Sequence, residues 1–291
     1  MKKIEFGELQ LSHTAKSNLK SCISKEWVSS GEKVLQFEKK WGKLFNYHHN
    51  KAVSSGTDAV TNLVASLYEF GANRGDEVIV PALCFIATAN AVLAAGLTPV
   101  FVDIERDTLN INPDKIEDAI TNKTRAILAV HTMGRPCDMD KINEVAKKHD
   151  IKVFEDACEA HGAKYKGRYV GKLGDGAVFS FYVAHLVCCG EGGMVSTDNK
   201  IIADSVHSTR THGRRDGDVY FEFDRIGFNS KMTDMQASIG LEGVEKFSWT
   251  FVTRRNHLFY LLQFIKKEHN AKKHAYFTEE APDDDYYHCP H

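Results

Sequence analysis

The sequence lacks any apolar run of the roughly 20 residues that a membrane-spanning helix needs. Its first eight residues, Met-Lys-Lys-Ile-Glu-Phe-Gly-Glu, also lack the apolar core of a signal peptide. We therefore expect no membrane segment and a cytoplasmic location. A strong excess of one charge is absent as well, because 37 Lys and Arg residues face 39 Asp and Glu residues. A net charge of -2 argues against a general nucleic-acid-binding surface.

A disulfide framework is also missing. The seven cysteines are odd in number and show no repeated spacing, which favours free thiols in a chain without a secretion signal. Cys188 and Cys189 are adjacent, whereas structural zinc ligands are usually spaced by about two to four residues. We therefore expect no metal site.

Short apolar segments alternate with helix-like stretches along the first half of the chain. Four of these segments, 76–81, 100–103, 126–131 and 151–156, have the length and composition of buried strands. This alternation is typical of an α/β protein with a parallel sheet. The segment 32–45 is amphipathic and predicts a packing helix, whose apolar face carries Val34, Phe37, Trp41 and Leu44.

Lysine is absent from the stretch around which the chain is organised. An apolar run that begins at Phe179 breaks at Gly190–Gly193 and then resumes, which predicts a strand, a tight glycine loop and a second strand. His185 lies in the middle of this run, and no lysine occurs between Lys172 and Lys200.

Residues 52–63 predict, in order, a short strand, a small polar turn and the start of a helix. Gly56 allows close approach of the backbone, and the amides of Thr57 and Asp58 at a helix N-terminus suit a phosphate dianion. The same residues equally suit a simple helix cap. A further strand ends in Glu155 and Asp156, which places an aspartate at the rim of the sheet.

These motifs resemble the DegT/DnrJ/EryC1/StrS family, pyridoxal phosphate (PLP) enzymes that act on nucleotide-linked keto-sugars. The resemblance covers roughly residues 10–265 and implies fold-type I, a three-layer α/β sandwich around a mostly parallel seven-stranded sheet. It implies a large PLP-binding domain over 1–235, then a linking helix and the start of a small C-terminal domain over 236–291. Because relatives continue further, we expect that domain to be incomplete.

The resemblance also assigns cofactor-binding roles. It places the phosphate at Gly56, Thr57, Asp58 and Ser180, the pyridine ring at Phe85, its nitrogen at Asp156, its O3′ near Glu159, and the neighbouring subunit's cofactor phosphate at Asn229. The Asn229 assignment implies a homodimer with shared active sites. From the residues alone, packing for Phe85 and a helix cap for Asp156 stay open. His131 and His212 are expected substrate contacts, although the residues alone favour a structural role for His131 over a substrate contact.

In most of the family, the position of His185 is the lysine that holds PLP covalently. An imidazole forms no stable imine, but its ordinary pKa of roughly 6.5 suits it to move protons. The exchange resembles the branch of 3-dehydratases that remove the C3 hydroxyl of 4-keto-6-deoxy sugars and work from pyridoxamine phosphate (PMP). That resemblance makes His185 the catalytic base, with Glu159 tuning proton transfer beside it.

The sequence therefore predicts a PLP/PMP-dependent 3-dehydratase of nucleotide-linked 4-keto-6-deoxy sugars, in deoxysugar or polysaccharide biosynthesis. Glutamate is the expected amino donor. Two alternatives stay open: a sugar aminotransferase of the same family, and a catalytically silent protein that binds the cofactor or a sugar nucleotide.

Overall fold

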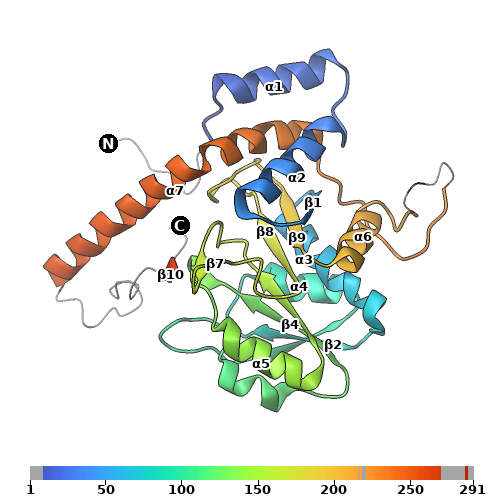
Figure 1. Cartoon of the computed structure of the whole chain (residues 1–291), viewed down its shortest axis with the longest axis vertical. Helices are drawn as coiled ribbons and strands as arrows, with labels where there is room; N and C mark the ends of the chain where they lie inside the picture. Colours follow the sequence, from blue (N-terminus) through green and yellow to red (C-terminus); the bar gives the residue numbers. More distant parts are fainter. Residues whose placement is uncertain (1–8, 216, 218–220, 270–285, 288–291) are drawn as a thin grey trace.

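A seven-stranded sheet lies at the centre of the chain (Figure 1). The computed structural model describes residues 9–215, 217, 221–269 and 286–287. The strand order is β1-β9-β8-β5-β4-β2-β3. Strand β9 runs antiparallel to both of its neighbours, and the other adjacent strands pair in parallel. The expectation of a mostly parallel seven-stranded sheet is confirmed.

The strands of this sheet are β1 (His49–Val53), β2 (Glu77–Pro81), β3 (Thr98–Val102), β4 (Thr124–Val130), β5 (Lys152–Asp156), β8 (Gly176–Ser180) and β9 (Gly193–Thr197). A small second sheet contains β6 (Lys164–Tyr165), β7 (Arg168–Tyr169) and β10 (Tyr286–Tyr287). The α-helices are α1 (His13–Ser24), α2 (Glu32–Phe45), α3 (Gly56–Ala65), α4 (Ile86–Ala94), α5 (Met139–His149), α6 (Lys200–Thr209) and α7 (Asp234–His269). Short 3-10 helices are η1 (Ser66–Phe70), η2 (Pro113–Lys115), η3 (Glu117–Ala119) and η4 (Thr132–Gly134). Across the described ranges, none of these helices has the length and apolarity needed to cross a membrane.

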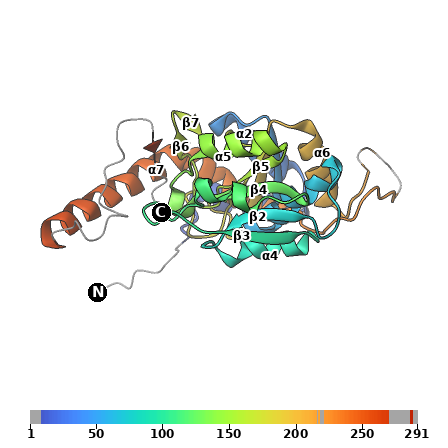
Figure 2. The same cartoon turned by 90° about the horizontal axis from the view of Figure 1, so that it is seen from below.

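Helices cover both faces of the large sheet, which produces the three layers expected from the sequence (Figure 2). In β4, Ala126 and Leu128 pack into a core cluster with residues of α3, α4 and α6. Ile127 and Ala129 pack into the opposite cluster, with residues of α2, α5 and α7. Because successive side chains of a strand point to opposite faces, a wholly apolar strand must be covered on both sides.

The amphipathic segment 32–45 forms α2 with the predicted bounds. Trp41 is fully buried, and its ring centroid lies 5.0 Å from that of Phe179 in β8. Its indole nitrogen donates a hydrogen bond of 3.2 Å to the Ser196 hydroxyl in β9. The sequence predicts Leu44 as the last residue of the apolar face. In the structure Leu44 is half-buried, and the neighbouring Phe45 is the buried residue at this end of the helix. Helix α2 is therefore fixed to the antiparallel end of the sheet.

Helix α7 begins at Asp234, close to the start that the sequence predicts. Its first half contributes Ala237, Leu241, Val244 and Phe247 to the core cluster that also contains α2. The division expected between residues 235 and 236 remains a prediction. The first half of the helix that follows it buries apolar residues in the main core, so this half cannot be separated from the core without exposing them.

The core of α2 provides a test of the fold. Replacement of Trp41 by Ala is expected to lower the free energy of unfolding by about 3–5 kcal/mol, because it removes a large buried ring and leaves a cavity. Trp249→Ala is the matched control, since Trp249 in α7 is 68% exposed. Urea unfolding followed by circular dichroism measures both. Equal losses in the two variants would contradict the assigned core.

Candidate active site

The predicted site residues gather at one edge of the large sheet. Strands β1, β2, β5 and β8 run in the same direction, so their carboxyl ends meet at this edge. Gly56 and Phe85 follow β1 and β2, while Asp156 and Ser180 are the last residues of β5 and β8. Open α/β sheets bind their ligands at the carboxyl ends of the strands.

Gly56, the first residue of α3, lies directly against Ser180. A Cβ atom at position 56 would be 2.7 Å from the Ser180 Cβ and 2.9 Å from its Oγ, closer than side-chain atoms can pack. Glycine is therefore required here, and it brings the N-terminus of α3 beside a serine hydroxyl. Thr57 is exposed at the same helix end. Helix N-termini favour anions through their amide groups and their dipole.

The expectation that the Asp58 amide binds phosphate needs correction. This amide donates a 3.0 Å hydrogen bond to Ser55 Oγ, which caps α3. The Asp58 carboxylate in turn accepts hydrogen bonds from the hydroxyls of Ser54 and Ser55. Ser55 is thus the N-cap of α3, which is the helix-cap alternative that the sequence left open. Gly56, Thr57 and Ser180 remain the predicted anion cradle.

Asp156 has one carboxylate oxygen anchored from α4. Its Oδ2 accepts a 2.9 Å hydrogen bond from the Thr88 hydroxyl, and its Oδ1 accepts one of 3.3 Å from the Cys158 amide. The Asp156 side chain is held rather than free to rotate. Phe85 lies one turn before Thr88 and is 75% exposed, so its ring is not part of the core. This exposure argues against the packing alternative for Phe85.

His185 lies in a loop and not in a strand. Strand β8 ends at Ser180, and the chain returns to strand geometry at Gly193. The backbone amide of His185 donates to the Tyr182 carbonyl over 3.0 Å, and its ring centroid lies 5.8 Å from that of His161. Burial, followed by the nearby charge of Arg254, lowers the pKa of His185 to about 4. The imidazole is therefore uncharged at neutral pH and can accept a proton.

Glu159 follows Asp156 by three residues and is half-buried. Its Oε2 accepts a 2.7 Å hydrogen bond from the backbone amide of Met133. Burial raises the pKa of the Glu159 carboxyl, and the negative charge of Asp156 adds to this rise. Glu159 consequently holds its proton more firmly than an exposed glutamate, which suits a group that exchanges protons.

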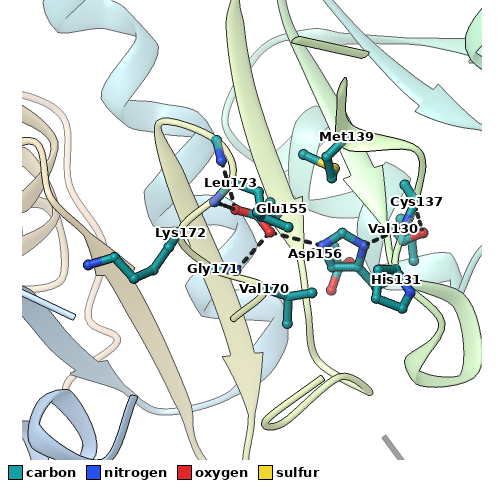
Figure 3. Close-up of polar contacts among 12 residues, drawn as sticks. Val130, His131, Cys137, Met139, Glu155, Asp156, Val170, Gly171, Lys172 and Leu173 are labelled. Carbon is teal, nitrogen blue, oxygen red and sulfur yellow. Dashed lines mark hydrogen bonds and ion pairs between the residues drawn. The ribbon is translucent and has the colours of Figure 1, made fainter. Parts of the chain in front are cut away.

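Behind the rim, Glu155 and His131 form a fully buried pair (Figure 3). His131 Nε2 lies 3.0 Å from Glu155 Oε2. The same carboxylate accepts hydrogen bonds from the backbone amides of Gly171, Leu173 and Gly174 at 2.7–2.8 Å. Both carboxylate oxygens are thus satisfied by donors from two segments of the chain, His131 and the 171–174 turn, as a buried charge requires.

The hydrogen bonds also fix the tautomer of His131. The Cys137 amide can only donate, so His131 Nδ1, 3.1 Å away, must carry the lone pair. The proton therefore lies on Nε2 and is donated to Glu155. With both ring nitrogens engaged and the side chain buried, the expectation that His131 contacts substrate is replaced by the structural role that the sequence left open.

Asn229 and His212 lie on neighbouring segments beside the cradle. Asn229 forms an isolated bridge with Thr211, and the exposed His212 donates its backbone amide to the Phe228 carbonyl over 2.7 Å. Lys231, two residues after Asn229, bridges Val53 at the end of β1 and hydrogen-bonds the Asn229 side chain. This places Asn229 and Lys231 near the start of α3. The role of Asn229 across a dimer and that of His212 toward substrate remain predictions.

Several residues that build the site carry no local sequence signal that identifies them. Thr88 donates a hydrogen bond to Asp156, and Glu155 precedes Asp156 in the buried network behind the rim. Arg254 contacts the His185 loop from 70 residues away in the sequence. Thr88 follows the expected ring residue Phe85 by three positions on one helix, which is the spacing that could have found it. The contacts of Glu155 and Arg254 depend on the tertiary fold alone.

Comparison with known proteins agrees with this geometry. The model of the DegT/DnrJ/EryC1/StrS aminotransferase family matches residues 10–289. The chain belongs to this family. It is 39% identical over 259 residues to the GDP-perosamine synthase of Escherichia coli O157:H7, which covers 89% of the chain and 70% of that relative. The chain spans only 58–60% of the length of three further curated relatives.

Two solved structures share the fold closely. Helicobacter pylori PseC, an aminotransferase involved in the biosynthesis of pseudoaminic acid, has a TM-score of 0.84 at 27% identity, over 92% of this chain and 71% of its own. E coli GDP-4-keto-6-deoxy-D-mannose-3-dehydratase, with bound hydrated PLP, has a TM-score of 0.83 at 29% identity, over 90% of this chain and 72% of its own. The expected fold-type I architecture and the PLP-type cofactor of the family are confirmed.

The residues present fit such a cofactor. The close contact between Gly56 and Ser180 places a helix N-terminus and a hydroxyl where a phosphate could bind. The anchored carboxylate of Asp156 suits a pyridinium nitrogen, and the exposed ring of Phe85 could stack on the pyridine ring. The group that this edge lacks is a lysine in the 181–192 loop.

The buried carboxylate gives a second prediction. Glu155→Gln is expected to cost about 3–5 kcal/mol of stability, because an amide offers one acceptor oxygen and turns its NH2 group toward backbone donors. Glu144→Gln makes the same change on the exposed face of α5 and should cost little. Guanidinium unfolding compares the two variants, and similar midpoints for both would refute the role of Glu155.

The low pKa of His185 gives a third prediction. Its folded-state value of about 4 lies below the unfolded value of 6.5, so protonation favours the unfolded chain as the pH falls through this window. The wild type should lose about 2 kcal/mol more stability between pH 7 and pH 5 than His185→Asn, which cannot titrate there. Unfolding curves at several pH values measure this. Parallel pH profiles for the two proteins would show that the His185 pKa is not depressed.

Proposed function

We propose that this chain is a PLP/PMP-dependent enzyme acting on a nucleotide-linked 4-keto-6-deoxy sugar. The observation that carries the proposal is the convergence of Gly56, Asp156, Ser180 and the His185 loop at one edge of the sheet. GDP is the nucleotide named in both the synthase and the dehydratase to which the chain is similar, so a GDP-linked sugar is the first substrate to test.

Amino transfer to the sugar ketone is the reaction that the relatives favour. The 39% identity to GDP-perosamine synthase is higher than the 29% identity to the 3-dehydratase. This supports the aminotransferase alternative over the dehydratase that the sequence predicts. Glutamate remains the proposed amino donor, and a homodimer with shared sites remains the proposed assembly.

Removal of the C3 hydroxyl is the second candidate, and His185 is the observation that favours it. A lysine stores PLP covalently between half-reactions, and no lysine occurs in the loop that carries His185. A neutral imidazole can instead accept a proton and pass it on. Both candidate reactions need a base at this place, and they differ in whether the sugar retains its C3 oxygen.

The residues of the chain divide the work at this site. When bound, the cofactor supplies an amino group and a ring that absorbs negative charge. Asp156, oriented by Thr88, keeps the ring nitrogen protonated, and the start of α3 with Ser180 holds the phosphate. Burial raises the pKa of the Glu159 carboxyl at the rim, which suits a group that exchanges protons. His185 accepts the proton that is removed during the reaction.

Product analysis tests the proposal. The protein is incubated with PMP, glutamate and GDP-4-keto-6-deoxymannose, and the nucleotide sugars are separated and weighed by mass spectrometry. The expected product carries an amino group in place of the ketone oxygen, and its rate of formation should fall at least about 100-fold in His185→Asn. A product that has lost one oxygen selects the 3-dehydratase instead.

A third outcome would overturn both reactions. If the cofactor binds but the sugar is returned unchanged, the chain is the silent binding protein that the sequence left as an alternative. Asp156→Asn serves as the control for cofactor binding, since it removes the carboxylate without changing the size of the side chain.

A further inference from the structure

Helix α7 lies along the loop that carries His185. A Cβ atom at Gly240 would be 2.4 Å from Cys189 Sγ, and one at Gly243 would be 3.1 Å from Val187 Cγ1. Two glycines, three residues apart on one helix face, thus let the loop approach the helix backbone. Figure 1 shows α7 beside α2 over its first half before it extends away from the body of the molecule.

Arg254 extends this contact to the residue before His185. Its Nη1 donates a 2.9 Å hydrogen bond to the carbonyl oxygen of Ala184. Loop residues 184, 187 and 189 therefore meet helix residues 254, 243 and 240, so the loop runs antiparallel to α7. The guanidinium is permanently charged and lies near enough to act on the His185 ring.

We propose that Arg254 is a positioning residue that fixes the His185 loop, and with it the imidazole ring, through its hydrogen bond to Ala184. The inference deepens the proposed function, because it rests on His185 being the group that accepts a proton. A cation beside an imidazole also opposes its protonation, so Arg254 adds to the effect of burial and keeps the ring uncharged at neutral pH.

The other groups that face His185 from the packed elements are consistent with this role. His161, in the turn after β5, has its ring centroid 5.8 Å from that of His185, and the Tyr182 ring lies at 6.2 Å. Burial raises the pKa of the Cys188 thiol in the same loop, so this thiol stays neutral.

The loop contact also links α7 to the chemistry. Phe251 still packs against the main core, and Arg254 lies three residues beyond it on the same helix. The hydrogen bond from Arg254 to Ala184 therefore joins the His185 loop to a part of α7 that the core holds in place.

The test is an NMR titration of the histidine rings in the cofactor-free protein. The resonance that disappears in His185→Asn identifies His185. Its titration midpoint is expected to shift upward in Arg254→Gln and Arg254→Met, and to stay near the wild-type value in Arg254→Lys. Amide hydrogen exchange at residues 184–188 should be faster in the two neutral variants, because the hydrogen bond to Ala184 is lost.

Arg255→Gln is the matched control, since it removes the same charge at the next position of the helix, where the side chain is exposed. It should leave the midpoint unchanged. Arg254→Met keeps the length of the aliphatic stem and serves if Arg254→Gln does not fold. An unchanged midpoint in a folded neutral variant overturns the proposal. The titration needs neither cofactor nor sugar, so its failure is distinguishable from failure of the proposed function.

Discussion

The carboxylate of Glu155 is the constraint on which the rim of the sheet depends. It is fully buried, and it is stabilised by the Nε2 proton of His131 and by three backbone amides of the 171–174 turn. Because neighbouring side chains of a strand point to opposite faces, an inward Glu155 turns Asp156 the other way. The network therefore holds the ends of β4 and β5 together and sets the position of the carboxylate proposed to meet the cofactor.

The site is complete apart from the chemistry at position 185. The glycine contact at the start of α3, the anchored Asp156 and the exposed Phe85 form what a PLP phosphate and ring require. In place of a lysine amine, the loop after β8 presents an imidazole whose pKa is lowered by burial and by Arg254. Under the proposed function, this change removes the covalent link to the cofactor and retains a proton acceptor.

Local patterns predict the features that depend on local geometry. The bounds of α2 and the beginning of α7 follow from periodicity. The loop around His185 begins directly after Ser180, well before the tight glycine loop at 190–193 that the sequence predicts. The roles of residues were predicted wrongly, or not at all, where segments distant in sequence meet. His131 seemed open to substrate because its contacts come from Glu155, 24 residues later, and from the Cys137 backbone. The burial of the first half of α7 in the main core likewise depends on side chains distant in sequence.

We propose that this chain binds PLP at the described edge of the sheet without a covalent bond. Intact mass measured after PLP loading and borohydride reduction is the decisive experiment, with His185→Lys as the positive control. The expected result is a bound-cofactor absorbance band, no added mass on the wild type, and one added cofactor on the variant. Stoichiometric addition to a wild-type lysine, such as Lys231 near the start of α3, whose pKa is lowered by burial, would contradict it.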